Sequence, residues 1–377
     1  MGRQCPTSLV SPFVKGMIFL KQERLKRVLQ EMDKNNLSQM IITETAPIFY
    51  LTGVWIHSGE RLMALYINTK GDKKFIVNEL FPVDNNLGVE VIYYNDTENP
   101  LDLLKGIINN NEVLGVDKDF KAHFLIGLMD RKVAKSFVNS SPIIDKIRMI
   151  KDLEEINLMR EASRINDLVV EKVITEIKDG ISEKFILNRL GELYEENKAE
   201  GFSFEPIVAF GENGANPHYE TGRCILKKGM GVLIDTGCVK NHYCSDMTRT
   251  VFFKEVTDKQ KEIYNIVLEA NINAMEKVKP GARFCDIDNA ARNTIEKYGY
   301  GKYFTHRTGH SIGIEVHDFG DVSAVNSEEL RPGMIFSIEP GIYLAKDMGV
   351  RIEDLVLVTE NGFERLNNLS KELQVVK

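Results

Sequence analysis

The stretch KGMGVLIDTG (residues 228–237) decides the fold of this chain, because it returns downstream as PGMIFSIEPG (residues 332–341). The two segments align with a shift of 104 residues, and an acidic residue occupies the same position in both. A second pair of segments, residues 178–197 and 279–298, repeats upstream of them at a similar shift. Two echoes at nearly the same shift favour duplication over chance similarity between βα units. We therefore expect two halves around a pseudo-twofold axis, with equivalent carboxylates converging between them.

The first segment continues through a turn candidate, VKNH, into a second β-rich run that contains Asp246. If the turn centres on Lys240 and Asn241, Asp235 of the first run lies directly opposite Asp246. Opposed Cβ atoms in a sheet are ~4.5–5.5 Å apart. Two carboxylates at that distance repel each other unless a proton or a cation lies between them.

The downstream segment repeats this arrangement with Glu339 and Glu353, whose midpoint is Lys346. A single acidic residue in a strand is usually solvated or part of a turn. Two opposed acidic pairs at duplicated positions in apolar strands favour metal binding instead, since buried carboxylates are costly unless cations neutralise them.

His310, in HRTGHSIGIEVHD (residues 306–318), is the fifth candidate ligand, because Gly309 and Gly313 allow the backbone to approach a site closely. One histidine with four carboxylates is a harder ligand set than structural zinc sites prefer, so Mn is the first choice, with Co, Fe or Zn as alternatives. Two ions ~3.5–4 Å apart would share a bridging hydroxide and polarise a carbonyl oxygen.

Two further histidines lie in Gly-rich segments that suit contact with a ligand. His218 belongs to GANPHYE, and His317 follows His310 by seven residues. For each of them a structural role and a functional role stay open. No motif supports the remaining histidines, which we expect at the surface or in the core: His57, His123, His242 and His306.

The N-terminal part alternates between helical and strand patterns, which predicts an α/β domain. Apolar spacing predicts a helix from Phe19 to about Asn35, and the turn TKGD predicts a hairpin between two of the strands. The pattern changes to a long helical run at residues 146–152. The strands are expected at residues 40–43, 62–68, 75–80, 89–95 and 112–117.

The composition excludes several classes of partner. A net charge of −7 and a pI near 5.7 argue against nucleic acid and anionic membranes, which require a basic surface. No apolar run is long enough to span a bilayer. The cysteines number five and lack CxxC spacing, which favours reduced thiols and a cytoplasmic protein. Residues 1–16 differ from the rest and are interpreted as an upstream extension.

Taken in order, seven short motifs of the second part resemble those of the pita-bread metallopeptidases: methionine aminopeptidase, aminopeptidase P and prolidase. The N-terminal segments IFYLTGV (48–54) and IRMIKDLEEI (147–156) resemble the creatinase-type domain that precedes the Xaa-Pro peptidases. The resemblance implies a creatinase-like α/β domain (17–148) followed by a duplicated α+β pita-bread catalytic domain (149–377). The seven motifs are NPH (216–218), IDTG (234–237), SDMTRT (245–250), TGHSIG (308–313), EVH (315–317), SIEPGIY (337–343) and RIED (351–354).

The resemblance also implies how the metal ligands divide. Asp235 would hold one metal ion, Asp246 and Glu353 would bridge both, and His310 and Glu339 would complete the other. The bridging hydroxide would attack the peptide bond between an N-terminal residue and proline, with Glu339 as the proton shuttle.

Three other residues acquire roles by the same resemblance. His218 and His317 would contact the substrate or the developing oxyanion. Arg351 would orient carboxylates or contact the substrate. Because relatives form dimers, a homodimer is expected, and Trp55 and His57 would reach the neighbouring subunit's active site unless they form an ordinary surface loop.

One departure from the family pattern bears on the substrate. Relatives often have HE, then a proline and sometimes a basic residue, where this chain has VHDFGDVS, with Asp318, Gly320 and Asp321. An aspartate would not hold the free carboxylate of a dipeptide, which favours an aminopeptidase on Xaa-Pro peptides over a strict dipeptidase. The alternatives are hydrolysis of a non-peptide N-acyl or amidine substrate on the same fold, and a non-catalytic peptide-binding relative.

Overall fold

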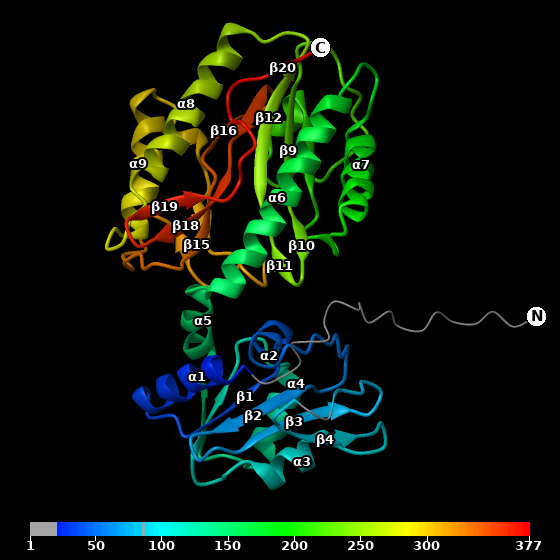
Figure 1. The fold of residues 1–377 in the computed structure, drawn as a ribbon, viewed down its shortest axis with the longest axis vertical. Helices are drawn as coiled ribbons and strands as arrows, with labels where there is room; N and C mark the ends of the chain where they lie inside the picture. Colours follow the sequence, from blue (N-terminus) through cyan, green and yellow to red (C-terminus); the bar gives the residue numbers. More distant parts are fainter. Residues whose placement is uncertain (1–20, 85–86) are drawn as a thin grey trace, which may run out of the picture. The chain divides into compact units, whose positions relative to one another are not determined.

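The computed structural model describes residues 21–84 and 87–377, and the chain divides into two compact units between Ile147 and Arg148 (Figure 1). The expected extension 1–16, the predicted domain start at Met17 and the first helix residue, Phe19, lie outside the described residues. Within the described ranges, no helix combines the length and the apolar character that crossing a bilayer requires.

The first unit is built on a mixed sheet with the strand order β4-β3-β2-β1-β5-β6. The predicted hairpin is confirmed, because β2 and β3 pair antiparallel around a turn in which Gly71 has a φ of +103°. All five predicted strands are present within a few residues of their expected ends, whereas α2, α4 and β6 were not predicted. The strands are β1 (Gln39–Ile42), β2 (Ala64–Asn68), β3 (Lys73–Asn78), β4 (Glu90–Tyr94), β5 (Val113–Val116) and β6 (Ser136–Asn139). The helices are α1 (Gln22–Lys34), α2 (Thr45–Thr52), α3 (Pro100–Ile107) and α4 (Ala122–Asp130), and α5 (Ser141–Met149) spans the division.

The second unit contains two helix pairs and several short sheets. Its helices are α6 (Leu153–Glu176), α7 (Glu183–Glu196), α8 (Asp258–Met275) and α9 (Phe284–Lys297), with 3₁₀ turns η2 (Gly211–Ala215) and η3 (Gly301–Tyr303). The strands up to α8 are β7 (Gly201–Phe202), β8 (Ile207–Phe210), β9 (Gly231–Thr236), β10 (Cys238–Lys240), β11 (Tyr243–Cys244) and β12 (Met247–Phe253). The later strands are β13 (Gly309–His310), β14 (Asp321–Val322), β15 (Ile335–Ile338), β16 (Gly341–Leu344), β17 (Met348–Arg351), β18 (Asp354–Thr359), β19 (Gly362–Arg365) and β20 (Val375–Val376).

The predicted duplication is visible in how the second unit packs (Figure 1). Helices α6 and α7 bury their apolar faces against β8, β9 and β12, while α8 and α9 do the same mainly against β15 to β18. A capping box begins both α6 and α8. Gly229 and Gly333, which align in the two echoes, have left-handed φ angles of +83° and +91°. The α/β domain followed by a duplicated α+β domain is therefore confirmed.

The two predicted hairpin registers had different outcomes. In the ladder of β9 with β12, Asp235 faces Thr248, so the predicted pairing with Asp246 is wrong by two residues. The reason is that Asn241 and His242, with φ of +49° and +65°, form the two-residue turn. A shift of two keeps both carboxylates on the same face of the sheet.

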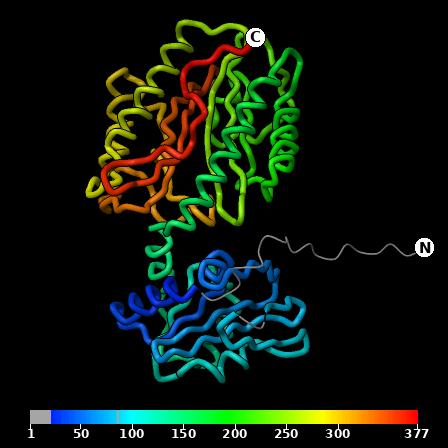
Figure 2. Tube along the Cα trace, in the orientation of Figure 1, coloured from blue at the N-terminus to red at the C-terminus, as the bar shows by residue number. Residues whose placement is uncertain are grey.

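The register around Lys346 is confirmed. The ladders β16–β17 and β15–β18 share one register, and Glu339 and Glu353 occupy opposed positions in the gap between them. Figure 2 shows the C-terminal segment, in red, ending near β12, where Val375 pairs with Phe252.

Candidate metal centre and active site

All five predicted metal ligands come from strand ends or strand junctions of the second unit and face one cavity of about 390 Å³. Asp235 lies on β9, and Asp246 immediately precedes β12. Glu339 and Glu353 lie at the two strand junctions of the second hairpin, and His310 ends β13. Strand ends suit this purpose because the flanking ladder fixes the backbone while the side chain points into the cavity.

The potential ligand atoms of this cluster lie close to one another. His310 Nε2 lies 3.5 Å from Asp246 Oδ2 and 3.4 Å from Glu339 Oε1. His310 Nδ1 lies 3.2 Å from the carbonyl oxygen of Ser311, which can only accept, so Nδ1 carries the proton and Nε2 presents a lone pair. A lone pair aimed at two carboxylates is repulsive unless a cation lies between them.

Unpartnered carboxylate oxygens point to the same conclusion. Among the described residues, one buried oxygen each of Asp235, Asp246 and Glu353 has no hydrogen-bond partner. One ligand atom each of Asp246, His310 and Glu353 lies within 4.8 Å of the others. Buried acceptors are rarely left unpaired, so this donor set fits divalent cations.

The pKa shifts of the cluster indicate that its carboxylates need nearby positive charge. Burial, followed by the charges of neighbouring carboxylates, raises the pKa of Asp246 and Glu353 well above the usual range. Burial also raises the pKa of Glu339 to about 7. Burial lowers the pKa of His310 to about 3, which keeps the imidazole neutral and able to bind a metal ion.

The predicted substrate-facing residues His218, His317 and Arg351 line the same cavity. His218 and His317 are exposed, and the ring centroid of His317 lies 4.3 Å from that of His310. The structure therefore brings all eight predicted site residues together.

The loop that carries His218 is held by one buried carboxylate, Glu183, which sequence reasoning missed. Glu183, at the start of α7, accepts hydrogen bonds from the backbone N–H of Phe210 at 2.8 Å and from Asn213 Nδ2 at 2.8 Å. Its other oxygen accepts from the Tyr219 hydroxyl at 2.9 Å and from the N–H of Gly222 at 3.2 Å. These contacts fix both ends of the loop on which His218 is exposed.

The guanidinium of Arg351 is already paired with other residues that line the cavity or lie beside it. It forms an ion pair with Asp235, and its Nη1 donates to the Tyr343 hydroxyl at 2.9 Å. That hydroxyl lies 2.8 Å from His306 Nε2. The expectation that His306 belongs to the surface or core without a site role is therefore wrong in part, since His306 lines the cavity. Its position four residues before His310 was the available signal.

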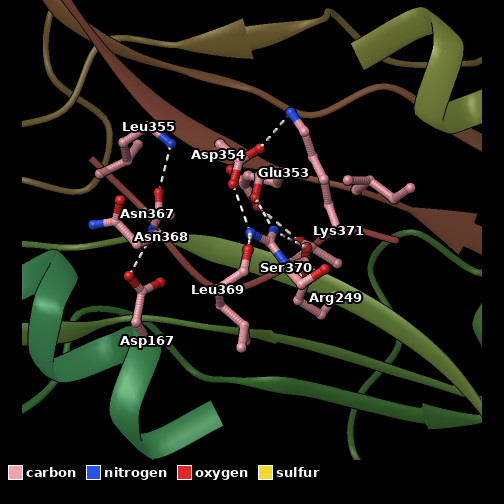
Figure 3. A network of polar contacts seen from close by, with 12 residues as sticks. Asp167, Arg249, Glu353, Asp354, Leu355, Asn367, Asn368, Leu369, Ser370 and Lys371 are labelled. Carbon is pink, nitrogen blue, oxygen red and sulfur yellow. Dashed lines mark hydrogen bonds and ion pairs between the residues drawn. The ribbon is translucent and has the colours of Figure 1, made fainter. Parts of the chain in front are cut away.

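Behind Glu353, a buried network ties the C-terminal segment to the ligand strands (Figure 3). Arg249 Nη1 donates to the carbonyl oxygen of Glu353 at 2.6 Å, and Nη2 donates to Asp354 Oδ1 at 2.6 Å. Lys371 Nζ lies 3.1 Å from the other oxygen of Asp354. The Thr248 hydroxyl donates to Glu353 Oε2 at 2.7 Å. Hydrogen bonds from β12 thus fix both the backbone and the carboxylate of Glu353.

The four cysteines that the structure describes contribute no ligand to the cluster. Cys224, Cys238, Cys244 and Cys285 are free thiols, and Cys5 lies outside the described residues. Burial raises the pKa of Cys238 to about 11, so this thiol stays protonated at neutral pH.

Comparison with known proteins identifies the family of this chain. Residues 157–360 match the metallopeptidase family M24, and residues 24–150 match the creatinase/prolidase N-terminal domain. An uncharacterized peptidase of Staphylococcus aureus is 36% identical over 357 residues, covering 92% of this chain and 99% of that protein.

Solved structures extend the likeness over both units. A dipeptidase from Pyrococcus horikoshii matches with a TM-score of 0.88 at 36% identity, covering 94% of this chain and 100% of that one. A prolidase from Thermococcus sibiricus matches with a TM-score of 0.89 at 35% identity, covering 94% of this chain and 99% of that one. The chain belongs to the M24 metallopeptidases and has the creatinase-type N-terminal domain. It is a peptidase whose family implies a divalent metal ion.

Proposed function

We propose that this protein is a dinuclear metal-dependent Xaa-Pro peptidase, which hydrolyses the bond between an N-terminal residue and proline. The observation that carries the proposal is the convergence of partnerless carboxylate oxygens and the His310 lone pair in one cavity. The activities by which the Pyrococcus and Thermococcus relatives are known, dipeptidase and prolidase, favour Xaa-Pro substrates.

Asp235, Asp246, His310, Glu339 and Glu353 would hold two divalent ions, with Mn as the first choice and Co, Zn or Fe as alternatives. When bound, such ions polarise the scissile carbonyl and lower the pKa of water, which supplies a nucleophile at neutral pH. The four carboxylates balance the charge of two divalent ions.

Glu339 is the proposed proton carrier. It lines the cavity, and its Oε1 lies 3.4 Å from His310 Nε2 and accepts from the Ser337 hydroxyl at 3.2 Å. A carboxylate there can take a proton from the attacking water and deliver it to the leaving amine.

The remaining roles follow from exposure and partners. His218 and His317, exposed at the cavity, would donate hydrogen bonds to the substrate carbonyl as negative charge develops on it. Arg351 would orient Asp235 rather than contact the substrate, because its guanidinium is buried and already paired.

The direct test follows release of the N-terminal residue from Xaa-Pro dipeptides and from longer Xaa-Pro peptides. The protein is first stripped with a chelator and then reloaded with Mn or Co. Metal-dependent cleavage is expected, and the substrate lengths cleaved separate a dipeptidase from an aminopeptidase. No cleavage of either substrate, with metal demonstrably bound, would direct attention to a non-peptide amide.

Variants separate the roles. Glu339→Gln should lower kcat by ~10²- to 10⁴-fold, the range of positioned acid–base groups. His218→Ala and His317→Ala should each lose about 10²-fold or more while retaining metal. The matched control is His123→Ala, an exposed histidine of the first unit, which should leave kcat unchanged. Full turnover by metal-loaded Glu339→Gln would eliminate the shuttle role.

The homodimer stays a prediction. Light scattering of the full chain measures it directly, and a monomeric mass would remove the expected reach of Trp55 and His57 into a neighbouring active site.

A further inference from the structure

One cation at the cavity, the guanidinium of Arg307, has no side-chain partner in the part of the chain that the structure describes. Arg307 lines the cavity and is exposed, and within residues 21–84 and 87–377 its side chain forms neither an ion pair nor a hydrogen bond. The other arginine of the cavity, Arg351, is paired with Asp235. Burial, followed by the positive charge of Arg307, lowers the pKa of His317, which lines the same cavity.

The backbone on both sides of Arg307 is rigidly held. The N–H and hydroxyl of Thr308 donate to Asp288 Oδ1 at 3.1 and 2.7 Å. Arg292, which also pairs with Asp288, donates to the carbonyl oxygen of His306 at 2.6 Å. Arg307 therefore projects from a fixed backbone while its guanidinium stays uncommitted, which suits recognition of an external ligand at a low ordering cost.

Neighbouring acids do not account for this charge. Asp318, which stands at the departure from the family pattern, is turned away into buried ion pairs with Arg148 at 2.6 Å and Lys151 at 3.5 Å. Asp321 forms no ion pair within the described ranges, and its backbone pairs with His310 in a short ladder. The carboxylates of the cavity floor are balanced by two divalent ions in the proposed function. The free cation thus points to an anionic group of the ligand.

We propose that Arg307 binds a carboxylate carried by the substrate and makes the site selective for carboxylate-bearing Xaa-Pro peptides. A guanidinium matches a carboxylate with two parallel hydrogen bonds, so this pairing is specific as well as favourable. The carboxylate has two possible sources, the free C-terminus of a dipeptide or an acidic side chain on the N-terminal residue. The inference rests on the proposed function. If the C-terminus is the source, Arg307 supplies from another segment the basic residue that is missing near Asp321, and the reason to favour an aminopeptidase no longer holds.

The test compares three substrates that share the scissile bond: Ala-Pro, Ala-prolinamide and Asp-prolinamide. Each is given to Mn-loaded wild type, Arg307→Met, Arg307→Lys and the control Arg223→Met. Arg223 is exposed, lies outside the cavity lining and forms no ion pair in the described part of the chain. Metal content and thermal unfolding of every variant are measured first.

If the C-terminus is the source, wild type prefers Ala-Pro over Ala-prolinamide by about 10- to 100-fold in kcat/KM, the range for a charge-assisted hydrogen bond. Arg307→Met abolishes this preference mainly through KM. Arg307→Lys keeps part of it, and Arg223→Met keeps all of it. If the side chain is the source, the same pattern appears in the ratio of Asp-prolinamide to Ala-prolinamide.

Two results would overturn the proposal, and only the second of them would also refute the proposed Xaa-Pro peptidase function. If wild type and Arg307→Met cleave all three substrates with the same ratios, the Xaa-Pro activity stands and the role of Arg307 is refuted. If metal-loaded wild type cleaves none of them, the proposed function fails and the role of Arg307 fails with it.

Discussion

Replacing Arg249 with methionine is expected to destabilise the second unit severely, because its partner Asp354 is fully buried. Arg249 donates to Asp354 at 2.6 Å and to the carbonyl oxygens of Glu353 and Leu369 at 2.6 and 2.8 Å (Figure 3). Methionine keeps the aliphatic stem and removes every donor, so that Asp354 retains Lys371 at 3.1 Å as its remaining ion-pair partner. Breaking a buried ion pair from one side costs about 3–5 kcal/mol.

Differential scanning calorimetry of metal-free protein measures this cost, since bound metal would add its own stabilisation. For a domain of this size about 1 kcal/mol shifts Tm by ~2–4 °C, so Arg249→Met should unfold ~6–20 °C below wild type. The matched control is Arg160→Met. Arg160 pairs with Glu364 at 2.6 Å, but the two side chains are 43% and 37% exposed. Such surface pairs contribute about 0–1 kcal/mol.

A second readout tests whether the network supports the metal centre as well as the fold. Because Arg249 fixes the backbone of Glu353, Arg249→Met should bind Mn more weakly than wild type in a calorimetric titration at a temperature where both are folded. If Arg249→Met unfolds within a degree or so of Arg160→Met and binds Mn as tightly as wild type, the reasoning about the buried pair is wrong.

Three further predictions follow from the site. Protein stripped of metal should gain stability as pH falls from about 8 to 6, which a series of Tm measurements would show. Burial raises the pKa of Glu339 to about 7, so in this range the native state binds a proton that the unfolded state does not. Bound Mn should remove this pH dependence. Gly309→Ala should lose metal and activity, because a Cβ there would overlap the Ser337 carbonyl oxygen. The control Gly106→Ala, on open helix surface, should keep its metal content and leave Tm unchanged or raised, as metal analysis and calorimetry would show. Glu183→Gln should lower kcat/KM while leaving metal content unchanged, and equal loss of metal would contradict a role confined to the loop of His218.

The hairpins show what the sequence could predict and where it could not. The register around Lys346 was predictable because the acidic pair is symmetric about a loop rich in Lys, Asp and Gly, and Lys346 does take a left-handed φ of +62°. The first hairpin was misplaced because Asn241 and His242 share the turn, and histidine gives only a weak signal for positive φ. The error left the site prediction intact, because side chains alternate with a period of two.

Residues that reach the site only through the fold were harder to predict. The proximity of His306 and Arg307 to His310 was the available local signal, but proximity in sequence does not say that these side chains turn into the cavity. The backing role of Arg249 depends on Asp354 and the C-terminal segment, more than 100 residues away. Long-range polar partners of this kind leave no periodic pattern, so sequence periodicity does not reveal them.

The duplication explains why the metal centre lies where it does. In each half, a buried asparagine on a long helix holds the strand beside an acidic ligand: Asn166 donates to the carbonyl oxygen of Thr236 at 2.9 Å, and Asn271 donates to that of Ile338 at 3.0 Å. The neighbours of those carbonyl-bearing residues are Asp235 and Glu339. An ancestral half with one such strand would present its acidic residues at an edge, where water could solvate them. Two copies facing each other bury both sets and create a cost that cations offset. On this view the metal requirement of this family is a direct consequence of pairing two acidic hairpins. The two halves differ in how the asparagine is used: unlike Asn166, Asn271 also donates to the carbonyl oxygen of Ile352 and accepts from Lys371 Nζ.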